Sequence, residues 1–121
     1  MPTCKVTFRP VLKLDVFILT QLGNGVGFPR LLAAVREDHY KYVVMQLVGP
    51  DLGKLRRAMP QQKFTLATAL RVCRQTLDRI KTLHEFGWLS RDIKAPNFAI
   101  GLASNSDVVY MLDFGLARRY R

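Results

Sequence analysis

The chain has 121 residues, room for one domain, and 49% of them are hydrophobic, which excludes a disordered tail and allows a packed core. It carries 19 lysines and arginines against 9 acidic residues, a net charge of +10. This excess is compatible with nucleic acid, an anionic membrane or an acidic protein substrate as partner, and equally with a solvated basic surface. Cys4 and Cys73 are far apart and form no CxxC pair, so we expect reduced thiols rather than a zinc or redox site.

The first predicted element is a helix that Pro10 can open and Gly23 can close. Its apolar residues recur at helical spacing: Val11, Leu14, Ile18 and Leu22. The longest apolar run here, residues 16–19, is too short to span a bilayer or to form a secretory signal. We therefore expect no membrane association and no export.

Residues 23–29 form a cluster of helix and strand breakers. Its glycines, at positions 23, 25 and 27, have the wrong spacing for a phosphate-binding loop and follow a helix, so we interpret the segment as a helix-to-strand turn. Residues 30–36 and 40–47 then predict two strands around a turn at 37–39, which is an antiparallel hairpin.

Two helices follow the hairpin. Asp51 can cap a short basic helix that runs through Arg57, and Thr65 can cap a long helix that ends near Gly87. The apolar stripe of the long helix comprises Leu66, Leu70, Cys73, Leu77, Ile80 and His84. We expect Cys73 in the core and His84 in the core or as a cap. Short strands at 98–100 and 108–112 complete an α+β fold.

The chemistry is concentrated in Ser90-Arg-Asp-Ile-Lys-Ala-Pro-Asn97 and Asp113-Phe-Gly115. This order and spacing is typical of the catalytic loop and the DFG motif of protein kinases. Asp92 can accept the proton of a substrate hydroxyl, and Lys94 can reach the transferring phosphate as a point charge. Asn97 and Asp113 offer the oxygen ligands that Mg²⁺ prefers.

The strings SRDIKAPNFAIG (90–101) and YMLDFGLARRY (110–120) resemble the casein-kinase-I superfamily, with its tau-tubulin-kinase and nematode-expanded branches. Residues 45–52 resemble the family's hinge, 11–19 its αC helix and 65–88 its αE helix. The resemblance implies a partial protein-kinase-like fold, with an N-lobe remnant at 1–48 and the start of the C-lobe at 49–121. It also implies phosphorylation of protein Ser/Thr with ATP and Mg²⁺, often at acidic or pre-phosphorylated sites, in the cytoplasm and also the nucleus.

The same resemblance implies roles around the nucleotide. Lys5 would be the ATP-binding lysine and Asp15 its ion-pair partner, Met45 the gatekeeper and Leu47 the hinge residue, and Ile100 or Leu112 would line the pocket floor. The apolar residues among these could equally be plain core. For Asp15 the alternative is a solvent-facing helix charge.

The sequence departs from the family in several places. Ser90 replaces the histidine of the HRD motif, Asp15 is one methylene shorter than the usual glutamate, and Lys5 stands closer to it than is usual. We expect a fragment without the glycine-rich phosphate loop or the rest of the C-lobe. Its long helix would then expose an apolar face and give weak stability.

Three functions remain open at this point. The chain can be a catalytic-domain fragment of a Ser/Thr kinase, active or idle as it stands. It can be a non-catalytic, pseudokinase-like binding protein. A nucleic-acid-binding module is disfavoured, because no reader motif or interleaved aromatic residues accompany the basic charge.

Overall fold

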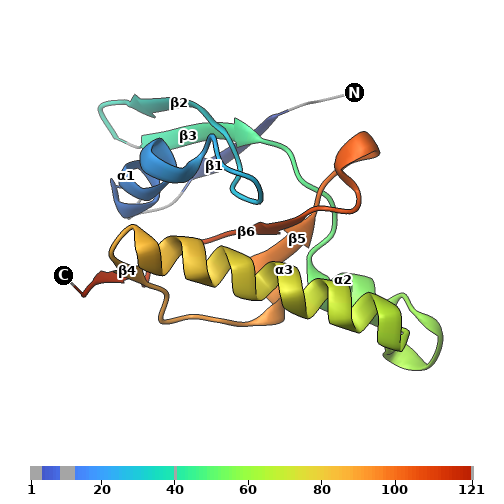
Figure 1. Ribbon diagram of the computed structural model, residues 1–121. Coiled ribbons are helices and arrows are strands. Elements are labelled where there is room, and N and C mark those ends of the chain that lie inside the picture. The colour runs from blue at the N-terminus through green and yellow to red at the C-terminus, as the bar shows by residue number, and fades with distance from the viewer. Residues whose placement is uncertain (1–3, 9–12, 40, 121) are drawn as a thin grey trace.

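The computed structural model describes residues 4–8, 13–39 and 41–120, with side chains from Leu14 onward, and has two layers (Figure 1). The upper layer contains β1 (Cys4–Phe8), α1 (Lys13–Leu22), β2 (Leu31–Arg36) and β3 (Lys41–Gln46). The lower layer contains α2 (Leu52–Arg57), α3 (Leu66–Glu85), β4 (Trp88–Leu89), β5 (Phe98–Ile100), β6 (Val109–Met111) and β7 (Arg118–Arg119). Short 3₁₀ turns lie at Pro60–Gln62, Ala95–Asn97 and Ala103–Asn105. The predicted α+β class is confirmed.

The strands form three small antiparallel sheets. The upper sheet has the order β1-β3-β2, and the predicted hairpin is confirmed by the pairing of β2 with β3, in which Arg36 lies opposite Lys41. In the lower layer β5 pairs with β6, also as predicted, and β4 pairs with β7. The predicted start of α1 at Pro10 lies outside the described residues. Among the described residues, every helix is too short or too polar to cross a membrane.

The helix caps predicted from sequence are confirmed. The Asp51 carboxylate accepts a hydrogen bond from the Lys54 backbone nitrogen at 2.9 Å, and the Thr65 hydroxyl accepts one from Thr68 at 3.2 Å. Each cap satisfies a backbone N–H that the first helical turn leaves without a partner. Gly87, with φ of +89°, allows the chain to leave α3 in the left-handed region.

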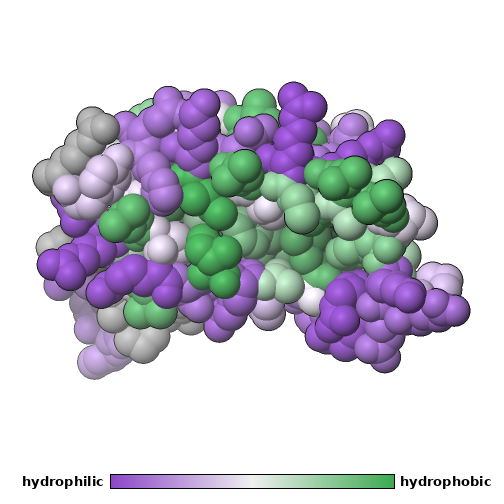
Figure 2. Space-filling view, turned by 60° about the horizontal axis from the view of Figure 1, so that its bottom comes forward, coloured by the Kyte–Doolittle hydropathy of each residue, from purple (hydrophilic) through white to green (hydrophobic). Residues whose placement is uncertain are grey.

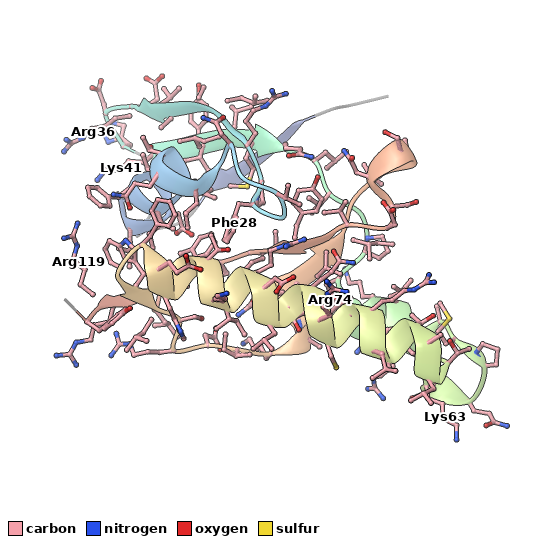
Figure 3. The ribbon with its side chains drawn as sticks, in the orientation of Figure 1. Phe28, Arg36, Lys41, Lys63, Arg74 and Arg119 are labelled. Atoms are coloured by element: carbon pink, nitrogen blue, oxygen red, sulfur yellow. The ribbon has the colours of Figure 1, made fainter. Side chains whose placement is uncertain are left out.

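The predicted turn between α1 and β2 also joins the two layers. Gly27 has φ of +84°, and its carbonyl accepts a hydrogen bond from Met111 at 2.8 Å. A Cβ at Gly27 would lie 1.6 Å from Nε of Arg79, which is itself buried and donates to the Val109 carbonyl. Phe28 follows and packs in the core, and in Figure 3 its ring lies between α1 and α3. Only glycine fits at Gly27, because the arginine passes directly beneath it.

Arg79 is a charged residue that the sequence pattern did not single out. Besides Val109, it donates through Nη2 to the side-chain oxygen of Gln75 at 3.1 Å. Burial lowers the pKa of the Arg79 guanidinium from its ordinary value, while nearby Asp78 and Tyr110 act in the opposite direction. The hydrogen bonds offset part of the cost of burying this charge.

The face of α3 that packs inward is not its most apolar one. Leu83 is fully buried and Val72 packs against the core, whereas Leu66, Leu70 and Leu77 are 77%, 61% and 66% exposed. The expected exposure of the long helix is confirmed. Cys73 lies on the exposed stripe, so its predicted place in the core is wrong. Figure 2 shows apolar surface gathered in a band with hydrophilic side chains along its borders.

Candidate functional site

A cleft of about 230 Å³ lies between the two layers and brings together residues far apart in sequence. Five of the predicted site residues line it: Asp15, Met45, Asn97, Leu112 and Asp113. Its other lining residues are Leu19, Pro29, Gln46, Val48, Pro96 and Phe114. The cleft therefore combines two carboxylates and two amides with an apolar wall.

Asp15 lies in the first turn of α1 and is 2% exposed. Its Oδ1 accepts a hydrogen bond from the backbone nitrogen of Phe114 at 2.9 Å. The alternative of a solvent-facing helix charge is therefore wrong. The Phe114 ring stacks on Phe28 with centroids 6.2 Å apart, so polar and apolar contacts together tie α1 and the turn that follows it to the segment after β6.

Lys5 belongs to β1, where its Cα lies opposite that of Met45 in β3. Its side chain lies outside the described residues, so its predicted contact with Asp15 stays a prediction. The backbone register places Lys5 beside a residue that lines the cleft.

The catalytic-loop residues Asp92 and Asn97 are held together directly. Nδ2 of Asn97 donates to the Asp92 backbone carbonyl at 2.8 Å and to its Oδ2 at 3.0 Å. The 3₁₀ turn that begins at Ala95, with Pro96 in its first positions, brings the two residues together. Asn97 is buried, and these bonds use its nitrogen, which leaves the amide oxygen Oδ1 as the group available for a cation.

Asp113 has φ of +60°, a left-handed conformation that few non-glycine residues adopt. Its Oδ1 accepts a hydrogen bond from the backbone nitrogen of Gly115 at 3.1 Å. Unusual backbone conformations of this kind gather at functional sites, where the surrounding structure holds them in place. Asp113 and Asn97 line the same cleft from two different segments.

Lys94 and Asp92 form an ion pair, with Nζ 3.6 Å from Oδ1. Lys94 is the more exposed of the two, so the pair adds little stability. Ser90, in place of the expected histidine, accepts a weak hydrogen bond from the Asp92 nitrogen at 3.4 Å. The residue that sequence reasoning missed is Arg91, whose Nε donates to the Leu116 carbonyl at 2.8 Å and links this loop to the segment after Asp113.

Two predicted pocket residues lie elsewhere. Leu47 lines a neighbouring hollow, and Ile100 packs partly buried against the core. Leu112, the alternative floor residue, lines the cleft, as does Val48, which directly follows Leu47. An extended segment exposes successive side chains on opposite sides, and the pattern alone did not show which of these two faces the cleft.

The polar groups of the cleft suit a hard cation. Among the described residues, no three His, Cys, Asp or Glu side chains gather as a metal centre would require. Mg²⁺, however, commonly takes only one or two protein oxygens and fills its other positions with water and phosphate oxygens. Asp113 and Asn97 provide such a pair of oxygens on one cleft, which fits Mg²⁺ bound together with a phosphate ligand.

The chain aligns with known kinases over nearly its whole length. It is 57% identical over 112 residues to the serine/threonine-protein kinase spe-6 of Caenorhabditis elegans, and 39% identical over 115 residues to a probable serine/threonine-protein kinase of Dictyostelium discoideum. This chain is similar to one part of serine/threonine protein kinases. The alignments include 93% and 94% of the chain but 30% and 23% of these relatives. No protein-family model matches.

The kinase relatives and the mixed α and β architecture together support a partial kinase domain. The similarity extends over both layers, because 112 aligned residues of 121 include most of each. The chain spans less than a third of the length of either relative.

Proposed function

We propose that this chain forms the nucleotide cleft and catalytic loop of a protein Ser/Thr kinase, whose reaction transfers the γ-phosphoryl group of ATP to a Ser or Thr hydroxyl. The observation that carries the proposal is the convergence of Asp15, Asn97 and Asp113 on one cleft, with Asp92 hydrogen-bonded to Asn97. Their order and spacing are those of the kinase motifs.

Each residue has one physical task in this proposal. Asp113 and Asn97 would hold Mg²⁺ through their side-chain oxygens. Asp92 would accept the proton of the substrate hydroxyl, and its bond to Asn97 fixes the direction in which its carboxylate points. Lys94, within 3.6 Å of Asp92, would neutralise charge on the phosphoryl group in transfer. When bound, Mg·ATP supplies the phosphoryl group and neutralises the charge that develops during transfer.

The apolar wall of the cleft would bind the adenine ring. Met45, the proposed gatekeeper, lines this wall together with Val48 and Leu112. For the hinge itself we keep Leu47 as the proposed source of backbone hydrogen bonds. Lys5 would contact the phosphates, and Asp15 would pair with it.

Within the kinases, we assign the chain to the casein-kinase-I superfamily on the strength of its catalytic-loop and DFG strings. Protein substrates with acidic or pre-phosphorylated sites suit a chain of net charge +10. We propose a cytoplasmic and also nuclear location.

The proposal is tested by the thermal melt of the purified chain with and without Mg·ATP. At ~100 times the dissociation constant, ligand should stabilise the folded state by about 2.7 kcal/mol, a shift of several degrees in Tm. The Asp113→Ala variant should lose the Mg²⁺-dependent shift. The Asp107→Ala variant should keep it, because the Asp107 carboxylate is exposed and lies outside the cleft. An equal shift in both variants would contradict the proposed metal site.

The exposed face of α3 favours a second candidate, a non-catalytic, pseudokinase-like binding protein. Leu66, Leu70 and Leu77 are each more than half exposed on one helix face, a surface that typically marks an interaction site. A chain that binds Mg·ATP but transfers no phosphate to casein or to an acidic Ser-containing peptide would favour this candidate.

A further inference from the structure

A second hollow, of about 920 Å³, lies beside the cleft, and Gln46 lines both. One wall is the turn from α1 to β2, residues 23–28, and the other is the turn from β5 to β6 around residues 102–105. In Figure 1 these turns lie on either side of the segment that follows β3. Of the residues assigned a role in the proposed kinase site, Leu47, the proposed hinge residue, lines this hollow.

Both walls are fixed by hydrogen bonds within the fold. The first wall is held at Gly27, whose carbonyl accepts from Met111 while Arg79 lies beneath it. In the second wall the Asn105 nitrogen donates to the Leu102 carbonyl at 2.9 Å, and the Val108 nitrogen donates to the Asn105 carbonyl at 3.0 Å. Binding sites are usually already formed in the free protein, as this hollow is. Little of the binding free energy is then lost to ordering the protein when a ligand binds.

The two walls carry exposed apolar side chains. Val26 is 72% exposed on the first wall and Leu102 is 41% exposed on the second. Buried Phe28 and Tyr110 lie deeper among the lining residues. A side chain that enters between the walls would therefore remove apolar surface from water on both sides.

The charge of the hollow is positive. Among the described residues Arg30 is the only charged one in the lining, and none of their carboxylates forms an ion pair with this guanidinium. The side chain of the neighbouring Gln46 already has partners. Its Nε2 donates a hydrogen bond to the Tyr110 hydroxyl at 3.1 Å, and its Oε1 accepts one from the backbone nitrogen of Arg30 at 3.2 Å. Arg30 is therefore the group available to an anionic ligand.

We propose that this hollow docks a short extended peptide segment of a partner protein, with an apolar side chain between Val26 and Leu102 and a carboxylate on Arg30. A single cation between apolar walls matches one carboxylate beside an apolar group. Nucleic acid would need several cations along its backbone, which the lining does not provide. The proposal does not depend on kinase activity, because no catalytic residue belongs to the hollow.

The test measures the fluorescence anisotropy of labelled octapeptides of glycine and serine that carry two leucines and two aspartates at varied spacing. At least one of these peptides should bind about tenfold more tightly than two control peptides of the same spacing. In one control lysines replace the aspartates, and in the other serines replace the leucines. Arg30→Glu should abolish this binding, and Leu102→Ser should weaken it about tenfold. Arg30→Gln, a milder change, should weaken it as well.

Matched variants outside the hollow provide the controls. Arg36→Glu changes the same charge at the other end of β2, where Figure 3 shows Arg36 pointing outward, and Leu32→Ser removes a leucine that is somewhat more exposed than Leu102. Both should bind as the parent chain does, and circular dichroism should show all variants folded. The proposal is overturned if lysine peptides bind equally well, if no peptide of the set binds, or if Arg36→Glu weakens binding as much as Arg30→Glu.

Discussion

Asp15 and Phe114 lie 99 residues apart in sequence, yet the Asp15 carboxylate accepts a hydrogen bond from the Phe114 backbone nitrogen at 2.9 Å. Because both groups are buried, removal of the acceptor leaves an N–H without a partner away from water. Asp15→Ala should lower the free energy of unfolding by about 1–3 kcal/mol in urea titrations. Asp15→Asn, which keeps an acceptor oxygen, should lose clearly less, and Asp38→Ala on an exposed turn should be neutral. Equal losses in the alanine and asparagine variants would contradict the bond's importance.

Gly27 should tolerate no other residue. Gly27→Ala incurs the strain of a positive φ, about 1–2 kcal/mol, and also displaces Arg79 from its hydrogen bonds. Gly87→Ala is the matched control, because Gly87 has φ of +89° but nothing within 4 Å of the added methyl group. Chemical unfolding should show a loss at Gly27 larger than that at Gly87 by at least about 1 kcal/mol. Similar losses at both sites would show that Arg79 adjusts without cost.

Arg119 should report on the contact between α1 and the end of the described chain. Its guanidinium lies 5.0 Å from the ring of Trp88 and 5.4 Å from that of Phe17, and Figure 3 shows it beside α1. Arg119→Ala should cost about 0.5–1 kcal/mol and shift the emission of Trp88, the one tryptophan of the sequence, to longer wavelength. Arg74→Ala on α3 should leave the emission unchanged. An unaltered spectrum in Arg119→Ala would contradict the contact.

The exposed stripe of α3 should limit the solubility and stability of the chain. Leu70→Glu and Leu77→Glu should reduce self-association in analytical ultracentrifugation while changing the free energy of unfolding by less than about 0.5 kcal/mol. Leu83→Ala, on the buried face of the same helix, should instead cost about 2–5 kcal/mol. A monomeric parent chain with a cooperative melt at ordinary mesophile temperature would contradict this prediction.

Local chemistry made much of the fold predictable. The caps at Asp51 and Thr65 and the hairpin between β2 and β3 follow from residue type and period, and each is confirmed. The catalytic-loop and DFG strings also predicted which residues share the cleft, since Asn97 and Asp113 both line it. These features depend on neighbours within a few residues or on a motif.

The errors and omissions all concern tertiary contacts. The apolar stripe of α3 predicts Cys73 in the core, but α3 turns the face of Leu83 and Arg79 inward instead. A buried arginine has no signature in hydrophobic periodicity, because its burial depends on acceptors such as the Val109 carbonyl, 30 residues away. The choice between Leu47 and Val48 depends likewise on the direction of one extended segment.

The attachment of Gly27 to Met111 and Arg79 also bears on how the two layers can move. A second backbone attachment lies where the Gly49 nitrogen donates to the Ile100 carbonyl at 2.7 Å. Rotation about the line through these two backbone attachments keeps both of them, but it separates the side-chain contacts of Asp15 with Phe114 and of Arg119 with Phe17. Domain closure about a few fixed points is a familiar hinge motion. Opening and closing of the cleft should therefore follow a single rotational coordinate, with Asp15 and Phe114 separating as it opens.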